Sequence, residues 1–166
     1  MKMIMIRQAV PADCPSIYQA HTRAIRELCS VDYDQIQIEA WAGPRRATDY
    51  LKPISRGRLF VAEFDSKVVG FSEYDNKTRE LKAVYVNPDY GRRGIGKDLF
   101  RYACDEARAE GLDALWLDAS LTAVPFYLAM RCQRQQGTTH RLMSGIELLC
   151  VRMTITLREG EPDFAG

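Results

Sequence analysis

The sequence predicts a single-domain α/β protein, with a mixed but mostly antiparallel sheet of six or seven strands and helices on both of its faces. The length of 166 residues suits one domain with a sizeable core. Short apolar runs typical of strands alternate with segments of helical periodicity. Near the middle, a strand, a glycine-rich loop and a helix follow one another, and such a crossover brings a parallel strand into the sheet.

The composition is that of an ordinary globular protein. Hydrophobic residues make up 46% of the chain and charged residues 27%. The 23 basic and 22 acidic residues leave a net charge of +1. A nucleic-acid partner is therefore disfavoured, and any anion must be bound locally.

The expected compartment and domain limits depend on sequence features that the chain lacks. The five cysteines include no C-x-x-C pair, which is typical of reduced, buried thiols and not of disulfides or a metal site. No apolar run is long enough for a signal peptide or a membrane span. We therefore expect a cytoplasmic protein without membrane or metal partners, with one domain over 1–158 and a polar tail over 159–166.

The first third of the chain reads as a strand followed by helices. Residues 3–7 form a short apolar run, and helical spacing then extends over 14–29 with His21 on the apolar side. A hydrogen-bonded structural histidine is favoured there over a catalytic one. A second helix is expected over 35–41. The segment 45–56 is expected to be helical only up to Lys52, because a proline disfavours helix at the residue before it. We interpret 30–57 as a lid that governs substrate choice.

Strands follow over 59–64 and 67–74, joined by the two-residue turn Asp65-Ser66. Gly70 predicts a bulge or a close approach to the backbone. After a turn at 75–78, a third strand covers 81–86 and stops at Pro88.

The loop after this third strand predicts an anion site. It runs Gly91-Arg92-Arg93-Gly94-Ile95-Gly96-Lys97 and leads into a helix that ends at Gly111. Unpaired amides and the dipole of a helix N-terminus attract phosphate. Glycines let the phosphate reach the backbone, and the basic side chains add charge. The glycine order matches neither a P-loop nor a dinucleotide fingerprint.

The last third adds three strands. Residues 112–118 form a buried strand that the crossover makes parallel to 81–86. A helical motif over 120–132 follows. Residues 133–157 then read as two antiparallel strands separated at Ser144-Gly145.

A family resemblance rests on these two motifs. The run Val86-x-Pro88-x-Tyr90-x-x-Arg93-Gly94-Ile95-Gly96-x-x-Leu99 resembles the acyl-CoA motif of the GNAT superfamily of N-acetyltransferases. The resemblance is clearest over 58–132 and extends to small stand-alone bacterial members. It implies that the loop amides hold the pyrophosphate of acetyl-CoA. It also implies that the central parallel strands splay apart, so that the backbone of Val84, Tyr85 and Val86 pairs with the pantetheine arm. Gly91 stands where the family has Gln or Arg.

The second motif resembles the other half of that site. Ala123 and Tyr127 match the family pattern, and Ser120 takes the place of its asparagine among the coenzyme-binding residues. The resemblance implies that Tyr127 protonates the departing thiolate. A tyrosine that only packs in the core is the competing interpretation. Arg131 and Cys132 replace a Gly-Phe pair, which predicts that the turn after this helix is not kept.

The chemistry so implied is acetyl transfer to a primary amine of a small molecule or peptide, directly within a ternary complex. A charged amine must lose a proton before it attacks. Glu80 lies where the histone-modifying branch of the family has its base, with Glu73, Glu27 and a water chain as alternatives. Amides around Val84–Val86 would stabilise the oxyanion. A non-catalytic acyl-CoA-binding or regulatory module is the alternative function, and a homodimer is left open.

Overall fold

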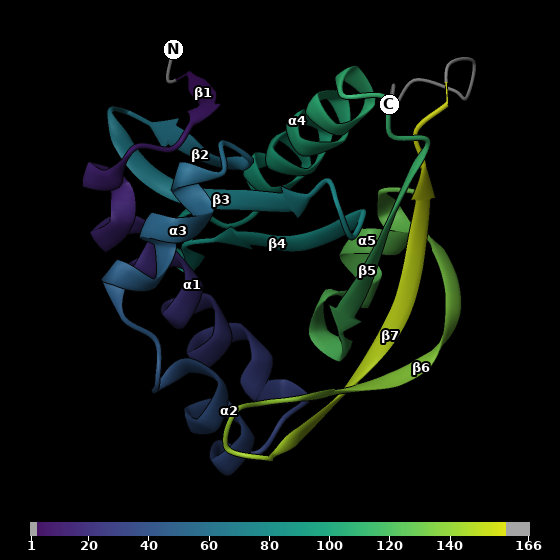
Figure 1. Ribbon diagram of the computed structural model, residues 1–166. Helices are drawn as coiled ribbons and strands as arrows, with labels where there is room; N and C mark the ends of the chain where they lie inside the picture. The colour runs from purple at the N-terminus through teal and green to yellow at the C-terminus, as the bar shows by residue number, and fades with distance from the viewer. Residues whose placement is uncertain (1–2, 159–166) are drawn as a thin grey trace.

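The computed structural model describes residues 3–158, which form one layer of sheet with helices on both sides (Figure 1). The sheet has seven strands in the order β1-β2-β3-β4-β5-β7-β6. This arrangement confirms the predicted mixed α/β fold. The tail expected over 159–166 lies outside the described residues.

The elements follow the predicted sequence of strands and helices. The strands are β1 (Ile4–Gln8), β2 (Leu59–Phe64), β3 (Lys67–Asp75), β4 (Glu80–Val86), β5 (Ala114–Ser120), β6 (Gln133–Arg141) and β7 (Glu147–Thr156). The α-helices are α1 (Cys14–Leu28), α2 (Gln35–Ala42), α3 (Leu51–Ser55), α4 (Ile95–Ala109) and α5 (Val124–Ala129). Short 3₁₀ turns are η1 (Pro11–Asp13), η2 (Cys29–Val31), η3 (Ala47–Tyr50), η4 (Pro88–Tyr90) and η5 (Leu121–Ala123).

The sheet consists of two antiparallel halves joined by one parallel pair. Strands β1 to β4 pair antiparallel in sequence order, and β5, β7 and β6 form the second antiparallel group. Strands β4 and β5 are the parallel neighbours, because α4 carries the chain back between them.

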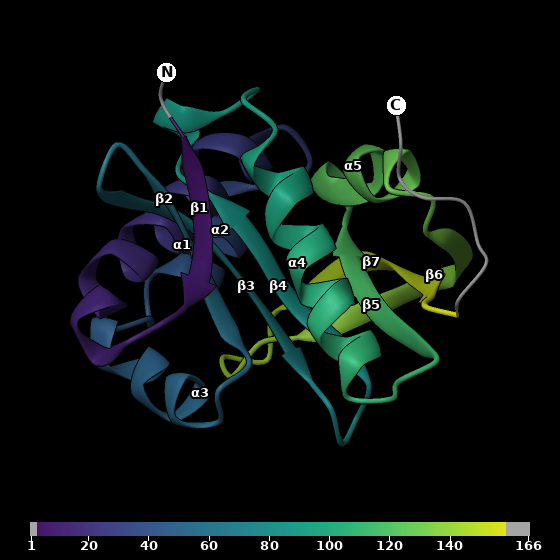
Figure 2. The same cartoon turned by 90° about the horizontal axis from the view of Figure 1, so that it is seen from above.

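Helices cover both faces of the first half of the sheet (Figure 2). Successive side chains of β2 point to opposite faces of the sheet, and each face is covered by a helix. Val61 packs with Ile17 of α1 on one face, while Ala62 packs with Leu99 of α4 on the other. We refer to these two sides as the α1 face and the α4 face. A third cluster joins Ile38 of α2 to Leu148 of β7.

Two local predictions for the hairpin are confirmed. Asp65 and Ser66 have φ of 55° and 64°, the left-handed pair that a two-residue hairpin turn needs. A Cβ on Gly70 would lie 2.8 Å from the carbonyl oxygen of Tyr85, so β4 approaches this backbone closely.

The predicted end of a helix at Lys52 is wrong. Helix α3 continues through Pro53 to Ser55. Because α3 begins at Leu51, Pro53 lies in its first turn, where an amide has no acceptor within the helix and its loss costs little.

All five cysteines are buried and free, as expected. Within residues 3–158, no helix has the length and apolar character to cross a membrane. The same residues contain no group of His, Cys, Asp or Glu side chains that could hold a metal ion.

Candidate functional site

Strands β4 and β5 are paired at one end only. Within the described chain, the residues that these two strands share in register are Glu80 and Trp116, and the amide of Trp116 also donates to the carbonyl of Arg79 at 3.0 Å. Beyond this point the strands diverge (Figure 1). The edge of β4 that faces β5 is therefore left without a strand partner along most of its length, as the resemblance implied.

The direction in which the amides and carbonyls of β4 point follows from a hydrogen bond just past the end of the strand. The amide of Asn87 donates to the carbonyl of Val69 at 2.7 Å, so that residue faces β3. Because backbone groups alternate along a strand, Tyr85 also turns its amide and carbonyl to β3, while Val84 and Val86 turn theirs toward β5. Of the three predicted backbone contacts, Val84 and Val86 are therefore placed to bind a ligand between the strands.

A β-bulge in β4 fixes where its side chains point. Glu73 pairs with Ala83 and Tyr74 with Leu81, which leaves Lys82 as the extra residue. As a result, Leu81 packs in the cluster on the α4 face, and Ala83 packs in the cluster on the α1 face. The side chain of Tyr85 also lies on the α1 face, against His21 of α1.

The loop after β4 is anchored before it reaches the glycines. The side chain of Asn87 accepts the amide of Asp89 and so caps the short turn η4. Arg23 of α1 donates to both carboxylate oxygens of Asp89, at 2.8 and 3.0 Å. Arg23 also pairs with Glu27, so this alternative base is bound to the same arginine that anchors the loop.

Gly94 provides the start of α4. It has φ of 78°, a left-handed conformation that favours glycine, and a Cβ there would meet no atom within 4 Å. The first helical bond runs from the amide of Asp98 to the carbonyl of Gly94 at 3.0 Å. The preceding amides of Ile95 and Gly96 have no acceptor within the helix, so the N-terminus of α4 is suited to bind an anion.

The other predicted loop residues have different surroundings. The Ile95 side chain is buried, and a Cβ on Gly96 would lie 3.3 Å from the ring of Phe126, so Gly96 allows α5 to pack closely. The guanidinium of Arg93 lies 5.1 Å from the centre of the Phe64 ring. Arg92 has φ of 61° and is exposed, and Lys97 is partly buried. The sequence could not reveal these packing roles, because they depend on distant strands and helices.

Tyr127 lies on α5, with its ring edge-on to Phe100 and Phe126. Its side chain is 7% exposed. Burial raises the pKa of the Tyr127 hydroxyl, and the nearby Tyr85 raises it further. Tyr127 therefore keeps its proton at neutral pH, which suits a proton donor.

The ends of α5 are held by local bonds. The hydroxyl of Ser120 accepts the amide of Ala123 at 3.2 Å and caps the preceding turn η5. At the other end, Arg131 has φ of 65° and Cys132 donates to the carbonyl of Tyr127 at 2.9 Å. The prediction that this turn is lost is wrong. Arg131 adopts the left-handed conformation, although glycine would adopt it with less strain.

Glu80 lies far from Tyr85 along β4. It stands at the paired end of the strand, five residues before Tyr85, or about 16 Å away at the usual rise of a strand. Burial raises the pKa of Glu80, and nearby Lys82 opposes the shift. The alternative Glu73 also has a pKa raised by burial, opposed by Lys82 and Arg56.

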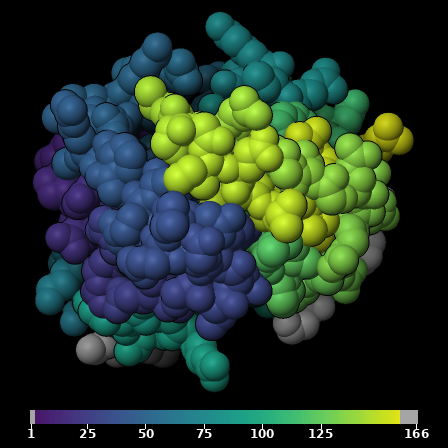
Figure 3. Space-filling model, turned by 90° about the horizontal axis from the view of Figure 1, so that it is seen from below, coloured from purple at the N-terminus to yellow at the C-terminus, as the bar shows by residue number. Residues whose placement is uncertain are grey.

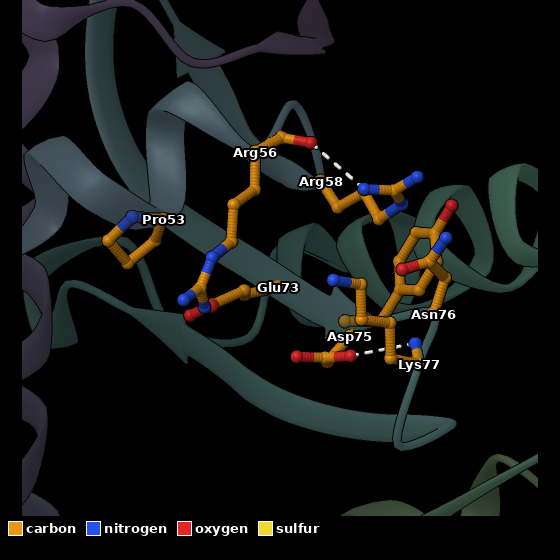
Figure 4. Close-up of a pocket in the computed structure, with 8 residues that line it drawn as sticks. Pro53, Arg56, Arg58, Glu73, Asp75, Asn76 and Lys77 are labelled. Atoms are coloured by element: carbon orange, nitrogen blue, oxygen red, sulfur yellow. Dashed lines mark hydrogen bonds between the residues drawn. The ribbon is translucent and has the colours of Figure 1, made fainter.

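Glu73 lines a cavity near the turn between β3 and β4 (Figure 4). The side chain of Arg56 extends toward the Glu73 carboxylate, while Asp75 caps the turn by accepting the amide of Lys77 at 2.8 Å. Asp75 is also the register partner of Glu80. The carboxylates considered as bases on β3 and β4 therefore gather at this end of the strands.

A cluster of polar aromatic residues on the α1 face was not expected as a unit. The Nδ1 atom of His21 lies 2.8 Å from the hydroxyl of Tyr50, and its ring centre is 4.2 Å from that of Tyr85. Burial, followed by the charge of Arg45, lowers the pKa of His21 well below 6.5, so its imidazole is neutral. The sequence predicted a hydrogen-bonded histidine, but its partners come from η3 and β4 and have no local signal.

The segment expected to act as a lid contacts the second half of the sheet. The hydroxyl of Tyr33 donates to the carbonyl of Leu149 at 2.6 Å and accepts the amide of Leu121 at 2.9 Å. The side chain of Gln37 on α2 donates to the carbonyl of Glu147 at 3.1 Å. Figure 3 shows the surface of this segment, in blue, against the β6–β7 hairpin, in lime. These contacts hold residues 33–37 against η5 and β7, on the side of the sheet where α1 packs.

The sequence matches the acetyltransferase (GNAT) family over residues 21–130. That range contains the second half of α1, the bulged and splayed strand β4, the glycine loop and Tyr127. No curated protein sequence matches the chain significantly.

Solved structures with this fold are numerous. A GCN5-related N-acetyltransferase from Rhodopseudomonas palustris is 27% identical, with a TM-score of 0.81 over 92% of this chain and 94% of that one. PaiA N-acetyltransferase from Thermoplasma acidophilum, solved with coenzyme A, is 20% identical, with a TM-score of 0.70 and coverage of 93% and 99%. YncA, a putative acetyltransferase from Salmonella typhimurium solved with acetyl-CoA, is 20% identical, with a TM-score of 0.69 and coverage of 98% and 99%.

Proposed function

The chain belongs to the acetyltransferase (GNAT) family, and from that premise we propose that it transfers an acetyl group from acetyl-CoA to the primary amine of a small molecule or peptide. The observation that carries the proposal is the splay of β4 from β5, next to the unpaired N-terminus of α4. Two similar structures, solved with coenzyme A or acetyl-CoA, support the choice of cosubstrate.

The residues present fit acetyl-CoA as the cosubstrate. The backbone of Val84 and Val86 faces the unpaired edge of β4 and can bond the amide groups of a pantetheine arm. Gly94 has open space where a side chain would stand, so a diphosphate can approach the first-turn amides of α4. Arg92 is exposed beside them and adds positive charge. Arg93 contributes less directly, because its guanidinium stacks on Phe64.

The reaction forms one bond from the amine nitrogen to the acetyl carbon and breaks the bond from that carbon to sulfur. The buried hydroxyl of Tyr127 gives its proton to the departing sulfur. The amides of Val84 and Val86 point to the same edge of β4 and can donate to an oxygen that gains negative charge. Tyr127 is later reprotonated from solvent, so the net products are an amide and a thiol.

The proton of the amine goes toward Glu80. Because Glu80 and Tyr85 are about 16 Å apart along β4, Glu80 accepts this proton through water and not by direct contact. Its raised pKa, caused by burial, brings it closer to the range of an effective base. Glu73, at the same end of the sheet, is the competing carboxylate.

Release of free thiol from acetyl-CoA, measured with a panel of primary amines, tests the proposal. We expect amine-dependent turnover, and we expect Tyr127→Phe to reduce kcat about tenfold or more while the affinity for coenzyme A changes less than about twofold. Binding of acetyl-CoA without turnover for any amine would instead support a non-catalytic acyl-CoA-binding module. Full activity of Tyr127→Phe would remove this residue from the mechanism.

A further inference from the structure

Arg45 is a cation that pairs with no carboxylate of residues 3–158. It lies in the short segment between α2 and η3, and its Nε atom is buried without a hydrogen-bond partner. The residue as a whole is partly exposed, but a guanidinium nitrogen that is buried without an acceptor costs free energy, so an anion that accepted its proton would be bound favourably.

The charge of Arg45 acts on the polar aromatic cluster of the α1 face. Burial raises the pKa of Tyr50 to about 12, and Arg45 opposes that shift. Burial also raises the pKa of Tyr85, and Arg45 opposes that shift as well. The charge of Arg45 therefore acts on both tyrosines and on His21, whose Nδ1 is 2.8 Å from the Tyr50 hydroxyl.

Tyr85 connects this charge to the reacting end of the site. Its ring lies 4.2 Å from that of His21, and its hydroxyl is close enough to affect Tyr127. On either side of Tyr85, the backbone groups of Val84 and Val86 face the gap between β4 and β5. An acceptor held between Arg45 and Tyr127 would thus have one end at a cation and the other at the acetyl group.

Acetyl-CoA is not the partner of this cation. Its phosphates are assigned to the N-terminus of α4, which packs on the α4 face, whereas Arg45 lies on the α1 face beside Tyr50. The anion must then belong to the acceptor. A guanidinium binds a carboxylate through two parallel hydrogen bonds, which makes carboxylate the best-matched group.

We propose that Arg45 binds a carboxylate of the acceptor, so that the substrates are small primary amines that also bear a carboxylate, as free amino acids do. This inference rests on the proposed acetyltransferase function. Polyamines are disfavoured, because the cation repels them. The N-terminus of a peptide is also disfavoured, because the neighbouring carboxyl group is tied up in an amide bond.

Pairs of acceptors that differ only in this group test the inference. Each amino acid is compared with its own carboxamide by thiol release, and kcat/KM is measured for both. We expect the wild-type protein to prefer the acid about tenfold or more, the effect of one charged hydrogen-bonded pair. The amine of a carboxamide is less basic and is more often neutral near pH 7.5. Amine ionisation alone would therefore favour the carboxamide.

Variants assign the preference to one residue. Arg45→Gln should remove the preference for the acid, because it lowers kcat/KM for the acid much more than for the carboxamide. Arg45→Lys keeps the charge but loses the planar fork, and it should restore part of the preference. Arg46→Gln is the matched control, since it removes the same charge from the exposed neighbour on the same segment and should behave as wild type. Binding of N-acetylated amino acids, measured by calorimetry, gives a readout without turnover.

The outcomes separate this inference from the proposed function. Turnover without a preference for the acid, or an equal preference in Arg45→Gln, overturns the role of Arg45 while the enzyme remains. Preference for a polyamine or a peptide also overturns it. Absence of turnover with every amine refutes the proposed function itself. If Arg45→Gln fails to fold, the wild-type ratio and Arg45→Lys still decide the question.

Discussion

Gly94 allows the proposed phosphate site to be tested against a control on the same helix. It precedes α4 with φ of 78°, and Gly111 follows α4 with φ of 88°. A Cβ at either position would meet no atom within 4 Å. Gly94→Ala and Gly111→Ala therefore introduce the same kind of backbone strain, without a steric clash, at opposite ends of one helix.

The expected magnitudes differ for stability and for binding. A non-glycine residue in the left-handed conformation costs about 1 to 2 kcal/mol, and for a domain of this size each kcal/mol lowers Tm by about 2 to 4 °C. Both variants should show this loss. Only the methyl group at Gly94 projects beside the first-turn amides of α4, where it would remove a charge-assisted hydrogen bond worth about 1.5 to 3 kcal/mol. Coenzyme A should then bind Gly94→Ala about 10- to 150-fold more weakly.

Thermal unfolding and calorimetric titration with coenzyme A measure the two effects separately. We expect similar losses of Tm in both variants and a loss of affinity in Gly94→Ala alone. Equal affinity in the two variants would show that the phosphates bind elsewhere. Equal weakening would show that strain in α4, and not access to its N-terminus, controls binding.

Two further variants examine the base and the turn after α5. Glu80→Gln should lower kcat at neutral pH about tenfold or more, with Glu73→Gln as the control, and it should remove the loss of activity that protonation of Glu80 causes as the pH falls toward its raised pKa. A larger loss in Glu73→Gln, seen in pH–rate profiles, would identify Glu73 as the base. Arg131→Gly should stabilise the protein by about 1 kcal/mol, because its φ of 65° strains an arginine and not a glycine. An unchanged or lower Tm would mean that the Arg131 side chain makes a compensating contribution.

Much of the fold could be predicted because its signals are local. The turn Asp65-Ser66 and Gly70, the crossover helix and the break at Ser144-Gly145 each depend on a few neighbouring residues. The helix end at Lys52 was predicted wrongly, because it does not depend on neighbouring residues alone. The effect of Pro53 depended on where α3 begins, and that position is set by the packing of Tyr50 and Ile54 into the core.

In the candidate site too, some features depend on adjacent residues and others on distant contacts. Its glycine loop could be predicted locally, because loop geometry and helix starts are encoded in adjacent residues, whereas Tyr127 was singled out only through the family resemblance. The surroundings of Arg93 and Gly96 could not be predicted from the sequence, because each of these residues contacts an element far away in the sequence.

The sequence by itself determined the order of strands and helices and the glycine-based start of the crossover helix. The tertiary structure alone decided which backbone groups of β4 face the splay, how far Glu80 lies from Tyr85, and that Arg45 meets the His21 cluster without a carboxylate partner. The reason is physical: helix and turn preferences act within a few residues, whereas charge pairing, burial and strand register are set by residues that only folding brings together.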